Sequence, residues 1–198
     1  MSSGPQLGAS GSTRHEVGPA RDEVARRVHD LVRLVPDYPE PGVLFRDITP
    51  LLADATAFAQ VVSTIADEVA DRWGHVDLVA GMEARGFLLA APVATALGAG
   101  VVPVRKAGKL PGPTAAAAYS LEYADAEIEI HPFTIRPGAR VLVVDDVLAT
   151  GGTAAATVEL LRSCQAQVVG LAFLVEIVGL AGRERLSGLE IDAVVAVD

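Results

Sequence analysis

Two adjacent acids followed by a glycine-rich turn form the stretch of this sequence with the clearest chemical character. The run 141–154, VLVVDDVLATGGTA, begins as an apolar strand and brings Asp145 and Asp146 to its end. The turn after them is made of small and hydroxyl-bearing residues: Ala149, Thr150, Gly151, Gly152 and Thr153. Free backbone N–H groups at a helix start bind phosphate, and carboxylates accept hydrogen bonds from hydroxyl groups. The run therefore predicts a site for a phosphorylated sugar.

The same run also has a purely structural explanation, in which the acids cap a strand end and the turn simply begins a helix. Two nucleotide-binding patterns do not fit it. A triphosphate loop needs Gly-x-x-x-x-Gly-Lys followed by Ser or Thr, and a dinucleotide loop needs Gly-x-Gly-x-x-Gly; the run contains neither. The acids and the turn in one run favour a sugar monophosphate.

Three cations gather in the segment 104–114, VRKAGKLPGPT, within a chain of net charge −9. Arg105, Lys106 and Lys109 have no acid between them, and the glycines and prolines favour a mobile loop over a helix. Such a loop can close over a strongly anionic leaving group such as pyrophosphate, exclude water and stabilise the charge. Alone, the segment also fits a solvated basic surface loop.

The loop 80–87, AGMEARGF, is a second candidate for anion binding. It offers backbone N–H groups between Gly81 and Gly86, together with the cation of Arg85. It has the length of Gly-x-x-x-x-Gly but lacks the Lys-Ser/Thr that would make it a triphosphate loop. Because most exposed arginines are only surface charges, Arg85 is a candidate whose role depends on the rest of the site.

Short apolar runs alternate along the chain with segments of helical periodicity. Strands are expected at 76–80, 101–104, 140–145 and 167–175, and helices at 86–97 and 153–164. This alternation predicts an α/β fold with a mainly parallel central sheet flanked by helices. Ligands of such folds bind beyond the carboxyl ends of the strands, which is where the candidate residues fall.

The N-terminal part adds two helices with a proline-rich connection. An amphipathic helix is expected from Arg21 to just before Pro36, and another over 54–73. The stretch 36–50 contains four prolines and should be an extended loop.

The stretch 120–130 breaks the strand–helix rhythm. Ile128 and Ile130 alternate with Glu127 and Glu129, as apolar and polar residues do in a half-exposed strand. The pattern predicts an inserted hairpin or an antiparallel edge strand.

Length and composition favour one domain, 21–198, after a flexible tail, 1–20. The chain has 198 residues, of which 51% are hydrophobic and 21% are charged. The net charge of −9 argues against a nucleic-acid surface, which works by neutralising phosphates. No apolar run is long enough to span a membrane, and the single cysteine, Cys164, suits a reducing compartment. A cytoplasmic protein that binds neither nucleic acid nor membrane is expected.

The run 141–154 resembles the phosphoribosyl-pyrophosphate (PRPP) binding motif of the type I phosphoribosyltransferase family. Further segments resemble the adenine-specific members of that family, in the same order and at similar spacing: 45–50 (FRDITP), 105–114 (RKAGKLPGPT), 119–123 (YSLEY) and 175–186 (VEIVGLAGRERL). The resemblance implies the type I fold with a small N-terminal hood at about 36–53 and an inserted flexible loop or hairpin. It also implies the purine-salvage reaction of adenine with PRPP, which gives AMP and pyrophosphate.

The resemblance assigns a role to each polar group of the site. Asp145 and Asp146 would hold the ribose hydroxyls, and the turn 149–153 would hold the 5-phosphate. Pyrophosphate would be bound by Arg85, Arg105, Lys106 and Lys109. Mg²⁺ would arrive bound to PRPP instead of occupying a protein cage, as suits an ion that keeps several waters.

The base site and the assembly are implied in the same way. The hood over adenine would include Leu44, Phe45 and Arg46. Glu122 would move a proton at the base, with Arg85 as the second catalytic residue, and the chain would form a homodimer.

Two alternatives stay open at this point. One is a phosphoribosyltransferase for another purine such as xanthine, which would share the PRPP motif. The other is a regulatory protein of the same fold that senses PRPP and binds nucleic acid, which would need a basic face.

Overall fold

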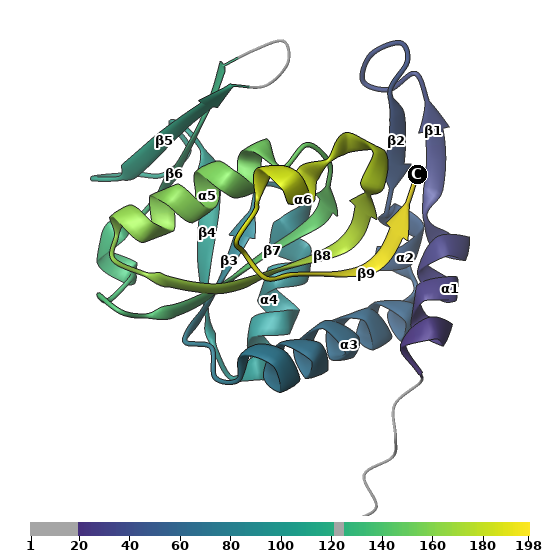
Figure 1. The fold of residues 1–198 in the computed structure, drawn as a ribbon, viewed down its shortest axis with the longest axis horizontal. Helices are drawn as coiled ribbons and strands as arrows, with labels where there is room; N and C mark the ends of the chain where they lie inside the picture. The colour runs from purple at the N-terminus through teal and green to yellow at the C-terminus, as the bar shows by residue number, and fades with distance from the viewer. Residues whose placement is uncertain (1–19, 121–124) are drawn as a thin grey trace, which may run out of the picture.

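A computed structural model of the chain describes residues 20–120 and 125–198 (Figure 1). Apart from Ala20, the expected tail lies outside the described residues, and so does Glu122. None of the helices in those ranges has both the length and the apolar character that crossing a membrane requires.

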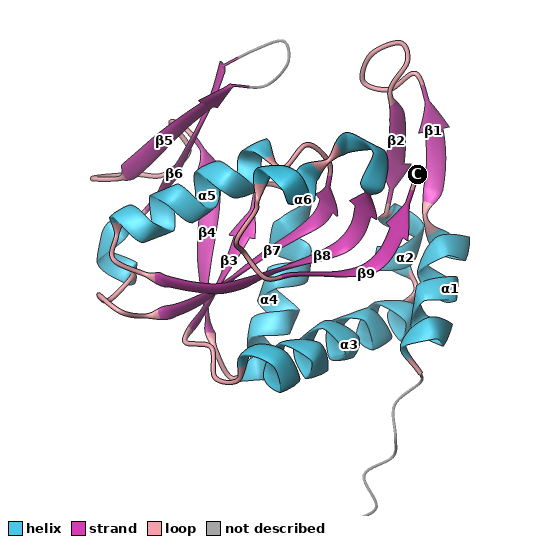
Figure 2. Cartoon of the chain, in the orientation of Figure 1, coloured by secondary structure: helices cyan, strands magenta, loops and turns pink. Residues whose placement is uncertain are grey.

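A seven-stranded sheet forms the centre of the molecule (Figure 2). Its strands are β3 (Leu78–Met82), β4 (Gly100–Lys106), β5 (Ala115–Ser120), β6 (Asp125–Ile130), β7 (Arg140–Leu148), β8 (Gln167–Ile177) and β9 (Ile191–Val197). The order across the sheet is β5-β6-β4-β3-β7-β8-β9, in which β4, β3, β7, β8 and β9 run parallel. Strands that are covered on both faces carry continuous apolar runs, which explains why they could be recognised. The predicted α/β fold is confirmed.

Helices cover both faces of this sheet. α3 (Ala55–Trp73) and α4 (Arg85–Leu97) pack on one face, and α5 (Gly152–Ser163) packs on the other. The side chain of Asp54 accepts a hydrogen bond from the Ala57 N–H and so caps the start of α3. The predicted helices over 54–73, 86–97 and 153–164 correspond to these three elements.

Smaller elements complete the fold. They are α1 (Arg21–Leu31), α2 (Thr49–Ala53), α6 (Gly182–Arg185) and the 3₁₀ turns η1 (Pro132–Thr134) and η2 (Val178–Leu180). Val24 and Val28 of α1 are buried against the core on the α3 side of the sheet.

The first helix is shorter than predicted. It ends at Leu31 because the following residues form β1 (Arg33–Pro36), which pairs antiparallel with β2 (Leu44–Asp47). The expected extended loop at 36–50 was therefore wrong in part, since it contains β2 and the start of α2. Hydrogen bonds between β1 and β2 pair the backbone N–H and C=O groups that helical hydrogen bonds would otherwise pair.

The edge of the sheet carries the predicted hairpin, formed by β5 and β6. β6 also pairs with β4, so that Lys106 lies opposite Ile128. Ile128 and Ile130 are buried as expected, but Glu129 is buried as well, at 6% exposed, because backbone N–H groups bind its carboxylate. The β5–β6 and β1–β2 hairpins project on the same side of the molecule, from opposite ends (Figure 1).

Candidate active site

The acid pair lies at the carboxyl end of β7, as the sequence predicts. Asp145 faces two adjoining cavities, whereas Asp146 is only 4% exposed and points toward α4. Burial raises the pKa of Asp145 well above its usual range, and repulsion from Asp146 adds to this rise. Burial also raises the pKa of Asp146, although the Arg85 guanidinium opposes the effect. Without a ligand, charge on this pair is costly.

Gly86 allows the first turn of α4 to approach the acids. A Cβ atom at Gly86 would lie 2.7 Å from Asp145 Oδ1 and 3.0 Å from the Val144 carbonyl oxygen. Only glycine fits this contact without a shift of the strand. The loop 80–87 and the acid pair, which are far apart in the sequence, are thereby fixed as one site.

Arg85 connects the acid pair to the β1–β2 hairpin. Its Nε lies 2.9 Å from Asp146 Oδ2, and its Nη1 donates to the Arg46 carbonyl oxygen at 3.0 Å. Its guanidinium carbon also lies 4.6 Å from the centre of the Phe45 ring, a cation–π contact. The guanidinium thus contacts one acid and the hairpin; its pyrophosphate role stays a prediction.

The glycine-rich turn lies directly beside Asp145. Residues 149–153 line a cavity of about 170 Å³ together with Asp145, and α5 begins at Gly152. Gly151 has φ +77°, and a Cβ atom there would lie 2.8 Å from the Gly182 carbonyl oxygen. The unpaired N–H groups of the first turn of α5 make this cavity suitable for a phosphate.

Replacing Gly151 with alanine is expected to lower the free energy of unfolding by about 1–3 kcal/mol, from the left-handed φ and the contact with Gly182. Gly138→Ala is the matched control, because Gly138 has φ +78° but no atom within 4 Å of a Cβ. Urea unfolding of both variants measures the two effects. If Gly151→Ala costs no more than Gly138→Ala, the close packing of the turn does not matter.

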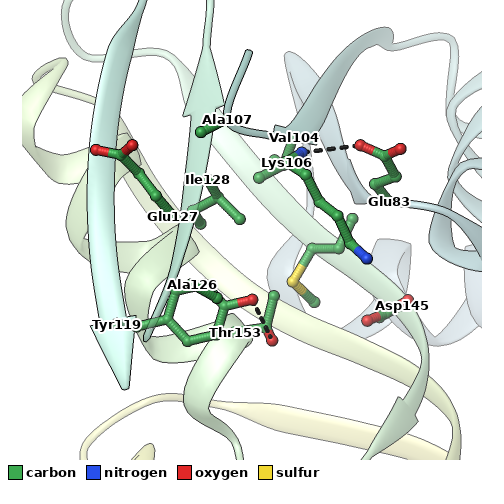
Figure 3. A pocket seen from close by; sticks show the side chains of 11 residues that line it. Glu83, Val104, Lys106, Ala107, Tyr119, Ala126, Glu127, Ile128, Asp145 and Thr153 are labelled. Atoms are coloured by element: carbon green, nitrogen blue, oxygen red, sulfur yellow. Dashed lines mark hydrogen bonds between the residues drawn. The ribbon is translucent and has the colours of Figure 1, made fainter. Parts of the chain in front are cut away.

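A second cavity, of about 450 Å³, opens between the β5–β6 hairpin and the ends of the parallel strands β3, β4 and β7 (Figure 3). We call it the large cavity, and we call the cavity of about 170 Å³ beside the turn the phosphate-sized cavity. The two share Met82, Asp145 and Thr153. Lys106 points into it beside Asp145, while the Glu127 carboxylate turns away (Figure 3). The two cavities together offer room for a ligand longer than a monophosphate.

The basic segment is held by two carboxylates, Glu83 and Glu129, for which the sequence predicted no such contact. Glu83 binds Arg105 Nε at 3.1 Å and the Lys106 N–H at 2.8 Å, and the second bond holds the pKa of Glu83 below its usual range. Glu129 binds the N–H groups of Lys109 and Leu110, both at 2.7 Å. Nothing in the local sequence reveals these long-range contacts.

The cations differ in position from the expected loop. Arg105 and Lys106 belong to the end of β4, because this strand continues beyond the predicted 101–104 to pair with β6. Lys106 lines the large cavity, whereas Lys109 is exposed and lines neither of the two cavities. The structure therefore brings Lys106 to the acids but not Lys109.

The hood residues divide between two faces of β2. Phe45 lines a cavity of about 330 Å³ with Tyr38 and Arg85. Leu44 and Arg46 point the other way, and Arg46 Nη2 donates to the Asp198 carbonyl oxygen at 2.6 Å. Successive side chains of a strand alternate between faces, so the three cannot all present side chains to one ligand.

Glu122 and Mg²⁺ complete the predicted site. Glu122 lies outside the described residues, and its catalytic role stays a prediction. Within the described ranges, no group of three or more His, Cys, Asp or Glu side chains is placed to hold a metal ion.

Comparison with known proteins identifies the family. The phosphoribosyl transferase domain matches residues 51–195. An adenine phosphoribosyltransferase from Frankia casuarinae is 54% identical over 178 residues, covering 90% of this chain and 94% of the relative. The chain belongs to the adenine phosphoribosyltransferase family. Another adenine phosphoribosyltransferase, from Streptomyces coelicolor, is 56% identical over 170 residues, with 84% and 92% of the two chains covered.

Solved structures agree with this assignment. The adenine phosphoribosyltransferase of Thermoanaerobacter pseudethanolicus has a TM-score of 0.84 and 43% identity, covering 87% of this chain and 99% of its own. The Saccharomyces cerevisiae enzyme, crystallised with an imino-altritol bisphosphate and adenine, has a TM-score of 0.84 at 34% identity, with 88% and 99% covered. The predicted type I phosphoribosyltransferase fold and family are confirmed.

Proposed function

We propose that the chain transfers the 5-phosphoribosyl group of PRPP to adenine, with AMP and pyrophosphate as products. The bond from the anomeric carbon to pyrophosphate breaks, a bond from that carbon to adenine nitrogen forms, and adenine loses a proton. The observation that carries the proposal is the junction of acid pair and phosphate-sized cavity in a member of the adenine phosphoribosyltransferase family. Within purine salvage, this reaction recovers the free base.

The acid pair and the turn bind the two ends of the sugar phosphate. The ribose hydroxyls donate hydrogen bonds to Asp145, which faces the cavities, and to Asp146, whose carboxylate becomes available when its ion pair with Arg85 opens. The 5-phosphate accepts hydrogen bonds from the N–H groups of the turn 149–153, where the helix dipole of α5 also favours an anion. Hydrogen bonds from these hydroxyl groups stabilise the ionised form of the two carboxylates, whereas burial destabilises it.

Pyrophosphate departs toward the cations at the end of β4. Lys106 already points into the large cavity, and Arg105 can exchange Glu83 for the more highly charged pyrophosphate. Lys109 reaches the ligand only if its segment moves inward. Arg85 lies at the acids and adds positive charge near the reacting carbon. Fixed cations that face developing negative charge stabilise the transition state.

Adenine lies against the hood in this proposal. Phe45 offers its ring to the base, while Leu44 and Arg46 contribute backbone groups from β2. Glu122 holds or moves the proton at the imidazole edge of adenine. The transition state at the anomeric carbon has oxocarbenium character, by analogy with glycoside chemistry, so the protein acts mainly by positioning and charge stabilisation.

The reaction also needs a metal ion and an assembled enzyme. Mg²⁺ would arrive bound to PRPP and would neutralise charge on the pyrophosphate; Asp145 is the described carboxylate that lines both cavities. The enzyme is a single domain over 21–198 after a tail, works as a homodimer and resides in the cytoplasm. Crosslinking and gel filtration of the purified chain test the dimer.

Incubation with PRPP, Mg²⁺ and one base at a time tests the function. We expect AMP from adenine at a rate at least about a hundredfold above the products from hypoxanthine, guanine, xanthine or orotate, since unmatched polar groups are strongly rejected in a buried site. Chromatography of the products measures this. Preferential use of xanthine would support the other transferase, and PRPP binding without any product would support a regulatory sensor.

A further inference from the structure

The short helix α6 carries two arginines with different surroundings. The Nε of Arg183 lies 2.7 Å from Glu176 Oε1, and its Nη1 donates to the Ile191 carbonyl oxygen at 3.1 Å. Arg183 therefore ties α6 to the ends of β8 and β9. Arg185, two residues later, makes neither contact and is exposed.

Packing of α6 on the glycine-rich turn brings Arg185 close to Gly152, which lines the phosphate-sized cavity. The Gly182 carbonyl oxygen would lie 2.8 Å from a Cβ at Gly151, so the two backbones are almost in contact. A Cβ at Gly152 would lie 3.5 Å from Arg185 Nη1. The guanidinium thus reaches the first residue of α5.

Tyr119 approaches the same residue of the turn as Arg185 does. The same Cβ at Gly152 would lie 3.7 Å from Tyr119 Cδ2. Tyr119 lines the large cavity, and its hydroxyl oxygen accepts a hydrogen bond from Thr153 Oγ1 at 3.3 Å. Arg185 and Tyr119 therefore both lie close to Gly152, which lines the phosphate-sized cavity.

The turn itself offers only neutral hydrogen-bond donors, and two acids lie beside it. A phosphate with close to two negative charges would gain from a cation at this point, and the planar fork of arginine matches phosphate oxygens. We infer that Arg185 is a ligand of the 5-phosphate, supplying from α6 the positive charge that the turn lacks. This inference rests on the proposed function, because it names a further ligand for the same sugar phosphate.

A 5-phosphate ligand far from the reacting carbon acts mainly on binding. Substrate and transition state carry the same phosphate, so its loss raises KM more than it lowers kcat. For Arg185→Gln we expect KM for PRPP to rise about five- to tenfold, the range for losing one charge-assisted hydrogen bond at an exposed site. Arg185→Lys should fall between wild type and Arg185→Gln, since lysine keeps the charge but not the fork.

Calorimetric titration with AMP and with adenine isolates the phosphate contact. Arg185→Gln should weaken AMP binding about five- to tenfold and leave adenine binding unchanged, because only AMP carries the phosphate. The matched control is Arg162→Gln, which removes an exposed arginine at the far end of α5. Its affinities should equal those of wild type.

The outcomes separate this inference from the proposed function. If wild type forms AMP from adenine while Arg185→Gln binds AMP as tightly as wild type, the inference is wrong and the function stands. An equal loss of AMP and adenine affinity would give Arg185 a structural role and would also overturn it. If wild type forms no AMP, the proposed function fails, and ribose 5-phosphate binding by wild type and Arg185→Gln decides the inference.

Discussion

Asp145→Asn is expected to lower kcat/KM for AMP formation by about a hundredfold, the usual cost of removing one charged group placed for the transition state. Asparagine has the size of aspartate but replaces one acceptor oxygen by a donor that faces a hydroxyl. It also removes the negative charge that balances the oxocarbenium-like sugar. Asp146, which is buried against Arg85, cannot take over this position.

The same substitution should leave the ligand-free protein at least as stable at neutral pH. Folding raises the pKa of Asp145 above its ordinary value of 3.8, so the folded state binds this proton more tightly than the unfolded state. The carboxylate therefore costs no stability below pH 3.8, and its cost grows as the pH rises through the folded-state pKa. Asparagine has no such cost, so the stability gap should favour the variant at neutral pH and vanish in acid.

Steady-state kinetics and urea unfolding at several pH values measure both effects. Asp71→Asn is the control, because it removes the charge of an exposed aspartate on α3. The control should match wild type in activity. Unchanged kcat/KM in Asp145→Asn would remove this residue from the site, and a large loss of stability would show that its carboxylate supports the fold.

Arg85→Met is expected to lower kcat/KM by about a hundred- to a thousandfold, as loss of one preorganised electrostatic group does. The variant loses the ion pair with Asp146, the hydrogen bond to the Arg46 carbonyl and the contact with Phe45. Arg85 would no longer fix the position of the acid pair relative to Phe45 and β2. The binding of both the ribose and the base should therefore weaken.

Arg85→Met should also lower the free energy of unfolding by about 1–3 kcal/mol, because it leaves the buried Asp146 carboxylate without its partner. This value is smaller than for a fully buried pair, since Arg85 is about a third exposed. Without Arg85, the pKa of Asp146 rises further. The loss should therefore be greatest at neutral and higher pH, and should shrink in acid as Asp146 takes up a proton. Urea unfolding across pH tests this, with Arg26→Met on the exposed face of α1 as the control.

The central sheet could be predicted because its strands are covered on both faces and so show unbroken apolar runs. The end of the first helix could not, because Val32 and Val35 continue the helical period although their backbone is extended, at the C-cap of α1 and in β1. Pairing with β2 decides this point, and pairing between segments leaves little trace in local periodicity.

The site shows the same division between local and long-range information. The acid pair and the turn lie within 14 residues of sequence, so one strand–turn–helix unit predicts their arrangement. Glu129 holds the basic segment from 20 residues away, and Arg85, just after β3, meets Asp146 on the neighbouring strand β7. Such contacts depend on strand order, which the sequence pattern alone does not specify. The division of Leu44 and Phe45 between two faces follows only once their segment is known to be a strand.

A crystal structure of the chain with bound AMP tests the central claim most directly. We expect phosphate oxygens about 3 Å from the N–H groups of the turn 149–153, ribose hydroxyls on Asp145 and Asp146, and adenine against Phe45. A phosphate bound at the basic segment around Lys106, or a ribose turned away from the acid pair, would contradict it.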